Sequence, residues 1–202
     1  MKGETKIYQK LILPINKCML TVGYKNSWYP INYRGQIHYG VDMVHRDGLT
    51  TLYGCGDGVV SHCGYDEICG NVLIVKYPNC LLKDNRIKNI VVRYFHLDRL
   101  NVRVGDKVNI LTVLGYYGKT GVQVNGAHLH VECDLDYDYP AYTPCLKGNS
   151  NILKASPKGY PDTTIDPTLV FYIKESNPEK QMVGVKYSGS VSHSDLKYDK
   201  LR

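Results

Sequence analysis

The chain has 202 residues, with 25 lysines and arginines against 19 aspartates and glutamates, and a net charge of +6 at pH 7. That length suits one domain with a sizeable core, with or without appendages. No apolar run approaches the length of a transmembrane helix, which excludes a helical membrane span. The moderate basic excess is compatible with a polyanionic partner but also occurs in ordinary soluble proteins, so charge does not select a function.

The cysteines and the N-terminal residues bear on the cellular compartment. Seven cysteines is an odd number, and their spacings contain no CxxC pair and no zinc-finger pattern. We therefore expect reduced thiols that pack as small hydrophobic side chains, which is typical of a reducing compartment. The first apolar stretch, residues 11–13, is followed at once by Pro14, Asn16 and Lys17. It is too short and too polar for a signal-peptide core, so we expect no signal peptide.

The composition favours a mainly β fold, because the chain contains 18 tyrosines and 19 glycines and shows no long amphipathic helical pattern. Residues 1 to about 35 predict an irregular arm packed along the edge of the core through Trp28, Tyr29 and Ile31. We divide the chain into an N-terminal arm, residues 1–22, and a folded domain, residues 23–172.

From His38 to about Glu132 the sequence is typical of strands separated by closely spaced turns. Short apolar runs predict strands at residues 40–44, 51–53, 58–62, 71–77, 90–96 and 113–115. The polar stretch 83–88 joins the two longest strands, and the connection from Cys80 to Ile90 is longer and more charged than a tight hairpin needs. The pattern predicts an antiparallel β-sheet core.

Beyond Asp134 the pattern loosens. Residues 134–165 are rich in tyrosine and predict a long loop, and Asp166-Pro167 opens a last short apolar segment. Residues 173–202 are polar and linker-like, so we expect a flexible C-terminal tail. Long loops of this kind are expected to form a groove beside the sheet.

Two histidine elements carry the candidate chemistry. His128 and His130 are separated by one residue in an HLH element that we expect to end a strand, so their side chains point to the same side. His38 and Asp42 would lie ~13 Å apart on a straight strand, and Gly40 between them supplies the backbone freedom for a bend. His38, Asp42 and one of the two later histidines make a two-histidine, one-carboxylate set. A catalytic zinc ion uses such a set when it keeps one position open for water.

A further histidine, His96, ends another predicted strand. Hydrolysis needs a group that takes a proton from water and returns one to the leaving amine, and histidine, with a pKa of ~6.5, suits that task. There is no HExxH element, so no glutamate on a helix can act as base. Asp98 and Glu132 are either partners of imidazole N–H groups or ordinary surface carboxylates. Together these residues indicate a metal hydrolase.

These elements resemble the lysostaphin-like zinc endopeptidases, peptidase family M23 or LytM-type domains, which cut peptide cross-links in bacterial peptidoglycan. The resemblance rests on three motifs in order: His38-x-Gly-x-Asp42, Tyr94-x-His96-Leu97 and Gly126-x-His128-Leu129-His130-x-Glu132. It covers roughly residues 23–172 and implies that this range is a zinc metallopeptidase domain with a lysostaphin-like, duplicated-hybrid-type fold.

By that resemblance the zinc ligands are His38, Asp42 and His130. His96 and His128 are then the catalytic pair, which acts as general base and stabilises the transition state, and Tyr33 is a candidate oxyanion donor. The implied activity is hydrolysis of cross-links or stem peptides of bacterial peptidoglycan at the cell wall.

Two other functions are compatible with parts of the sequence. One is a non-catalytic LytM-type module that binds or activates other cell-wall hydrolases, although such members usually lack ligands and every ligand position is filled here. The other is a basic nucleic-acid binder, which only the modest charge and the tyrosines favour, so we expect no nucleic-acid partner. A wall hydrolase without a signal peptide is expected to be a phage lysin, a virion-associated enzyme or a protein exported by another route. The sequence makes no prediction of oligomeric state.

Overall fold

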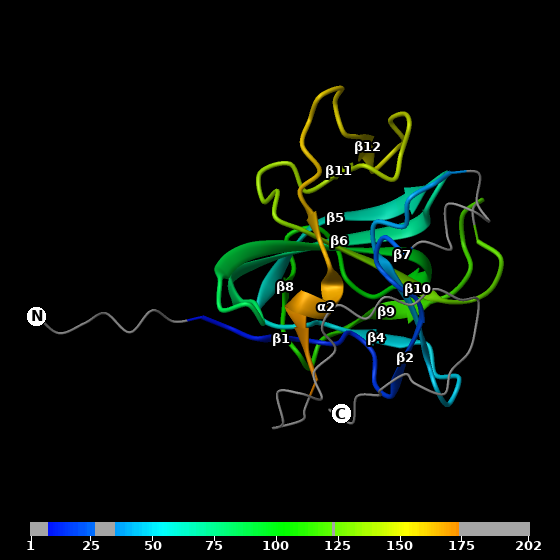
Figure 1. Ribbon diagram of the computed structural model, residues 1–202. Coiled ribbons are helices and arrows are strands. Elements are labelled where there is room, and N and C mark those ends of the chain that lie inside the picture. The colour runs from blue at the N-terminus through cyan, green and yellow to red at the C-terminus, as the bar shows by residue number, and fades with distance from the viewer. Residues whose placement is uncertain (1–7, 27–34, 123, 174–202) are drawn as a thin grey trace, which may run out of the picture.

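A computed structural model describes residues 8–26, 35–122 and 124–173 (Figure 1). Its main sheet has ten strands, and the longest path through it runs β2-β3-β10-β7-β6-β5-β8. All neighbours on this path are antiparallel, which confirms the predicted antiparallel β core. The strands of the path are β2 (Cys18–Val22), β3 (Val41–His45), β5 (Gly58–Asp66), β6 (Gly70–Leu81), β7 (Ile87–Leu100), β8 (Lys107–Val108) and β10 (Leu129–Asp134).

Smaller elements complete the described fold. Strand β9 (Val113–Tyr117) pairs with β7 and β4 (Thr51–Tyr53), and β13 (Thr164–Ile165) pairs with β10. Two parallel pairs lie outside the sheet: β1 (Leu11–Ile12) with β14 (Phe171–Tyr172), and β11 (Tyr142–Thr143) with β12 (Lys154–Ala155).

One short helix, α2 (Pro167–Val170), precedes β14. The side chain of Asp166 accepts a hydrogen bond from the Thr168 amide, and proline occupies the start of the helix, where its missing N–H costs nothing. Within the described residues, no helix has the length and apolar character needed to cross a membrane.

The central strands β6 and β7 are buried on both faces. Leu73 and Val75 face the larger hydrophobic cluster, whereas Val72 and Ile74 face a smaller one, which Leu153 covers. This explains why β6 reads as a continuous apolar run rather than an alternating one. Figure 1 shows the loops that carry β11 and β12 beside β5 and β6, at the top of the view.

The N-terminal residues differ from the expected irregular arm. Residues 11–12 and 18–22 form strands, and Leu11, Leu13 and Leu20 are core residues with at most 1% of their surface exposed. The expectation of an irregular segment is therefore wrong at these positions, because strand partners far along the chain, β3 and β14, order them. The predicted anchors at 28, 29 and 31 lie outside the described residues.

Three local predictions also need correction. The connection after Cys80 is a hairpin, because Leu81 pairs with Ile87 and the polar residues extend β6 and β7 at an exposed sheet end. His96 lies inside β7 rather than at its end. The HLH element opens β10 instead of ending a strand, since the strand begins at Leu129.

The region after β10 is more ordered than one long loop. It contains the two-residue strands β11, β12 and β13, so the long loop predicted over residues 134–165 is pinned by short strand pairs. Ile173 is buried, with 4% of its surface exposed, and the rest of the predicted tail lies outside the described residues.

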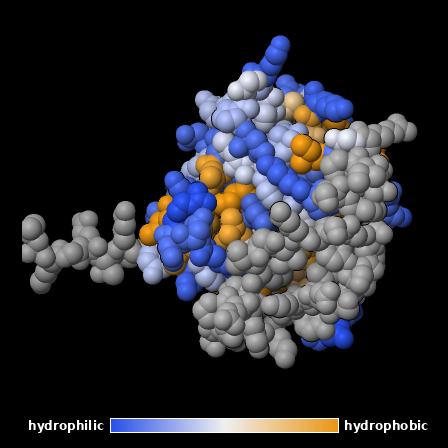
Figure 2. Space-filling view, viewed as in Figure 1, coloured by the Kyte–Doolittle hydropathy of each residue, from blue (hydrophilic) through white to orange (hydrophobic). Residues whose placement is uncertain are grey.

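All seven cysteines are free thiols, and five of them are buried. On the face seen in Figure 2, hydrophobic residues form small patches separated by hydrophilic ones.

Candidate metal centre

Strand register brings the candidate ligands together. In the antiparallel pair β3–β10, Asp42 lies directly opposite His130. On the other side of β10, His130 lies opposite Phe95 of β7, whose ring stacks on the imidazole with 5.1 Å between ring centroids. His38 belongs to the segment just before β3. Asp42 and His130 are therefore fixed by backbone hydrogen bonds of the sheet, and only His38 has to be brought in by a bend.

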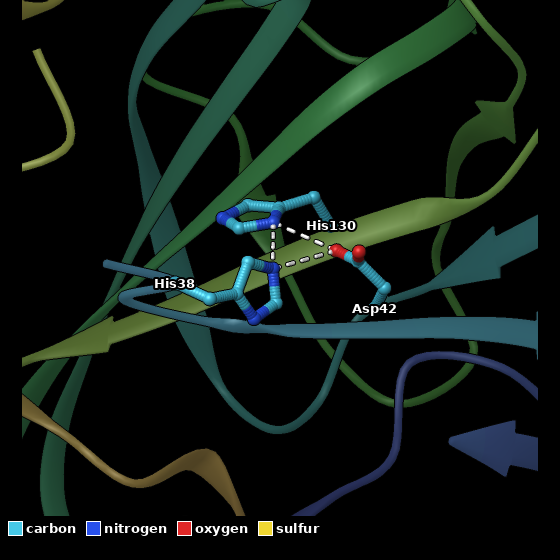
Figure 3. A group of neighbouring side chains, drawn as sticks. All are labelled: His38, Asp42 and His130. Carbon is cyan, nitrogen blue, oxygen red and sulfur yellow. Dashed lines mark hydrogen bonds and ion pairs between the residues drawn. The ribbon is translucent and has the colours of Figure 1, made fainter. Parts of the chain in front are cut away.

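The three side chains converge on one point (Figure 3). Asp42 Oδ1 lies 2.8 Å from His130 Nδ1 and 3.0 Å from His38 Nε2, and the two histidine nitrogens are 3.0 Å apart. Ligands of a tetrahedral zinc ion, each at ~2.0–2.1 Å, are separated by roughly 3.3 Å. The three groups need to part by only a few tenths of an ångström, so they fit a metal ion, and all three are buried.

Gly40 permits this convergence for a reason that differs from the expected one. Gly40 does not have a positive φ angle, unlike several other described glycines. Instead, a Cβ atom at this position would lie 2.4 Å from the Val131 carbonyl oxygen and 2.8 Å from His130 Nε2. The glycine is needed because strand β10 and the ring of a candidate ligand pass against its backbone.

The second nitrogens of the two candidate ligand histidines have different surroundings. His38 Nδ1 donates to the Gly23 carbonyl oxygen at 3.0 Å, which leaves Nε2 with the lone pair that a metal needs. His130 Nε2 is buried and makes no hydrogen bond within the described residues; Glu132 Oε1 lies 3.6 Å away. No sequence pattern pointed to Gly23, because a backbone carbonyl group has no side-chain signature.

His96 and His128 lie beside the convergent set. Their ring centroids are 5.1 Å apart, and His128 Nε2 is 3.6 Å from Asp42 Oδ1. His96 Nδ1 donates to the Thr120 carbonyl oxygen at 2.9 Å, and His128 Nδ1 donates to that of Gly126 at 2.8 Å. In the neutral form of each ring, Nε2 is therefore the nitrogen that can accept a proton.

A break in strand pairing orients the His96 side chain. The β6–β7 register shifts between Asn71 and Leu73, and His96 has a φ angle of 62°, in the left-handed region that bulky residues rarely adopt. The His96 amide donates to the Cys69 carbonyl oxygen across this break. The sequence did not predict this irregularity, because it depends on the register of two long strands.

Burial and close contact shift the pKa values of these groups in different directions. Burial tends to raise the pKa of Asp42, but the nearby imidazoles of His38, His128 and His130 hold it well below its usual range. Burial would lower the pKa of His130, but its hydrogen bond with Asp42 and the nearby Glu132 carboxylate raise the pKa to about 10. For His96, burial and the neighbouring His130 lower the pKa to about 4. His96 is therefore neutral near pH 7.

Loops form a groove above this cluster, as expected from the sequence. Its lining includes His96, His130 and the segments 35–39, which contains His38, and 144–147. Five of the six predicted site residues come together here. Tyr33, the predicted oxyanion donor, lies outside the described residues.

Comparison with known proteins gives the relationship of the chain. It is 32% identical over 104 residues to peptidoglycan DD-endopeptidase ShyC of Vibrio cholerae, covering 52% of this chain and 22% of that protein. It is 32% identical over 113 residues to lysostaphin of Staphylococcus staphylolyticus, covering 54% of this chain and 21% of that protein. The chain thus spans about a fifth of the length of these curated relatives.

Solved structures share the fold. The crystal structure of a zinc containing peptidase from Vibrio cholerae matches with a TM-score of 0.50 at 25% identity, covering 62% of this chain and 37% of that one. Lysostaphin from Staphylococcus simulans matches with a TM-score of 0.53 at 21% identity, covering 80% and 52%. These likenesses confirm the lysostaphin-like fold. Residues 36–140 match the family model of Peptidase family M23, and the chain belongs to that family.

Proposed function

We propose that this protein is a zinc-dependent endopeptidase that hydrolyses cross-links or stem peptides of bacterial peptidoglycan. One observation carries the proposal: His38 Nε2, Asp42 Oδ1 and His130 Nδ1 converge within 3.0 Å of one another, with two further histidines beside them. A buried cluster of this composition serves no packing purpose, because each polar group is costly to bury unless it is paired.

The three convergent residues are the proposed zinc ligands. When bound, zinc would lower the pKa of a water molecule and polarise the scissile carbonyl group. Two imidazoles and one carboxylate would leave a position open for substrate or water, which is typical of catalytic rather than structural zinc sites. His38 is already held in the required tautomer by the Gly23 carbonyl group.

The two remaining histidines are the proposed catalytic pair. With Nδ1 of each ring donating to a carbonyl oxygen, Nε2 of His128 and of His96 can take a proton from the attacking water and return it to the leaving amine. Once protonated, the same nitrogens can donate to the oxyanion of the transition state. Tyr33 remains part of the proposal as a further oxyanion donor.

The substrate class is proposed from the relatives. ShyC carries the name peptidoglycan DD-endopeptidase, and a further relative, ALE-1 of Staphylococcus capitis, carries the name glycyl-glycine endopeptidase. The two names denote different peptide bonds. The net charge of +6 suits an anionic cell wall. We propose wall peptides as the substrate and a phage lysin or virion-associated enzyme as one setting, with the bond to be identified by digestion of walls of different cross-link chemistry.

The test combines zinc content with release of new amino termini from purified walls. We expect about one zinc ion per chain, loss of hydrolysis on chelation, loss of both metal and activity in His130→Ala, and loss of activity with retained metal in His128→Ala. His62→Ala is the matched control, because the His62 ring hydrogen-bonds to the neighbouring Ser61 and lies outside the cluster. Zinc-loaded protein that binds walls without cleaving them would indicate the non-catalytic module instead.

A further inference from the structure

Next to the candidate ligand His130, strand β10 carries a buried ionic cluster. Arg93 donates from Nη1 to Glu132 Oε2 at 2.9 Å and from Nη2 to Asp134 Oδ2 at 2.7 Å. Its Nε donates to the Pro140 carbonyl oxygen at 2.8 Å. The β7–β10 register places Arg93 directly opposite Glu132. The exposed fractions of these three charged side chains are at most 2%, so the charges are held almost entirely out of water.

Such a cluster is a poor source of stability. Removing two charges from water costs several kcal/mol per ion, and replacing buried ion pairs with apolar side chains of similar volume is often neutral or stabilising. Val91 and Phe95, which flank Arg93 on the same face of β7, belong to a hydrophobic cluster that apolar side chains at the charged positions would extend. The position of the charges therefore calls for an explanation other than folding stability.

Glu132 is the member of the cluster that approaches the metal centre. It lies two residues after His130, so both side chains point to the same side of β10. Glu132 Oε1 is 3.6 Å from His130 Nε2, slightly beyond hydrogen-bonding distance. That nitrogen is buried and makes no hydrogen bond within the described residues, whereas Nδ1 of the same ring faces Asp42 and His38.

Two groups fix the Glu132 carboxylate in this position. Arg93 holds Oε2, and the hydroxyl group of Thr143 donates to Oε2 at 2.9 Å and to Oε1 at 3.2 Å. Thr143 is fully buried and belongs to β11, in the segment that continues into the groove wall at Cys145. The Cys145 amide in turn donates to the Thr143 hydroxyl oxygen at 3.2 Å.

We propose that Glu132, held by Arg93 and Thr143, is a positioning residue for His130: its carboxylate accepts a hydrogen bond from the Nε2–H group of that ring, which leaves Nδ1 to face the metal. Histidine ligands usually donate their second N–H to a carboxylate or carbonyl group, which fixes the tautomer and the ring orientation. His38 has such a partner in Gly23, and Glu132 supplies the equivalent for His130. This inference rests on the proposed function, since it assumes that the cluster binds zinc.

The test compares two variants that disturb the same arginine. Glu132→Gln removes the carboxylate that faces His130, whereas Asp134→Asn removes the other carboxylate bound to Arg93, which does not face the ring. Zinc affinity of the full chain is measured by competition with a chelating dye, with zinc alone as the probe. We expect Glu132→Gln to bind zinc about 10–100-fold more weakly and Asp134→Asn to retain the affinity of the unchanged protein.

A spectroscopic readout separates positioning from folding. In the zinc-loaded protein the ¹⁵N shifts of His130 should show Nε2 protonated, and its Nε2–H signal should move in Glu132→Gln but not in Asp134→Asn. If Glu132→Gln does not fold, Thr143→Ala replaces it, because it loosens the same carboxylate while leaving the charges paired; it should weaken zinc binding by a smaller factor.

The outcomes distinguish this inference from the proposed function. Equal zinc affinity in the unchanged protein and a folded Glu132→Gln or Thr143→Ala would overturn the positioning role while leaving the metallopeptidase proposal intact. Equal weakening by Glu132→Gln and Asp134→Asn would also overturn it, because the effect would then come from the ionic cluster as a whole. Failure of the unchanged protein to bind zinc would overturn the proposed function itself.

Discussion

The two faces of strand β10 differ in what they contribute. Val131 and Cys133 point into the larger hydrophobic cluster, whereas His130, Glu132 and Asp134 point to the side that carries the candidate metal centre and the buried ions. Apolar burial is non-directional, so the first face tolerates changes that preserve volume. The second face depends on each group keeping its partner. One strand therefore joins a face that stabilises the fold to a face that orients the site.

The largest effect is expected from Arg93→Met. The substitution leaves Glu132 and Asp134 as two adjacent buried carboxylates without a cation, and breaking a buried pair in this way costs about 3–5 kcal/mol. Urea denaturation monitored by circular dichroism measures the change. A cost below about 1 kcal/mol would mean that water reaches the cluster and that the polar face is less demanding than we infer.

A matched triple variant sharpens the comparison. Arg93→Met combined with Glu132→Leu and Asp134→Leu removes all three charges, and apolar replacement of buried ions is often neutral or stabilising. We expect stability close to that of the unchanged protein together with weakened zinc binding. If the triple variant kept both the stability and the zinc affinity of the unchanged protein, the polar face of β10 would not be needed to orient the site.

The next effect is expected from Gly40→Ala, which acts where the two elements of the site meet. The added Cβ would lie 2.4 Å from the backbone oxygen of Val131, so β10 and the segment just before β3 must separate. Overpacking against a fixed backbone costs about 3 kcal/mol, and displacement of His130 should weaken zinc binding as well. Thermal unfolding and the dye competition measure both. Gly126→Ala is the control, because an added Cβ there meets no atom within 4 Å.

A moderate effect is expected on the apolar face. Val131→Ala removes two buried methyl groups, which costs about 2 kcal/mol at ~0.8 kcal/mol for each group plus a small cavity. Because the side chain points away from the site, zinc affinity should change little. A loss of affinity larger than the loss of stability would show that the two faces are coupled through the strand.

The smallest effect is expected at Asp66, a buried carboxylate that neutral donors satisfy. It accepts hydrogen bonds from the amides of Ile68, Cys69 and Leu153 and from the hydroxyl group of Ser150. Burial raises its pKa, but these bonds outweigh that effect and lower it below the usual value of 3.8. Asp66→Asn should cost about 1 kcal/mol near pH 7.

The pH dependence of this variant follows from the sign of the shift. Because the folded-state pKa of Asp66 is depressed, the carboxylate stabilises the fold fully above about pH 4 and less as the pH falls through the folded-state value. Denaturation at several pH values between 2 and 7 should show the two proteins converging at low pH. A constant difference in stability across that range would contradict the role of the charge.

Much of the fold and of the site could be predicted from the sequence. Apolar runs bounded by glycine and polar residues located the central strands, because strand formation there follows local pattern and β-branched content. The five histidine and aspartate positions followed from spacing on a strand and from a resemblance to a known family. His128 and His130 had to share a side once the segment was a strand.

Only the tertiary structure decided how these residues meet. The β3–β10 register set Asp42 against His130, a break between β6 and β7 aimed His96, and the Gly23 carbonyl fixed the tautomer of His38. The N-terminal strands formed because distant partners ordered them. Each of these features depends on contacts between residues far apart in the chain. Local sequence determines which segments become strands, whereas register and backbone approach, which no short motif encodes, determine what those strands bring together.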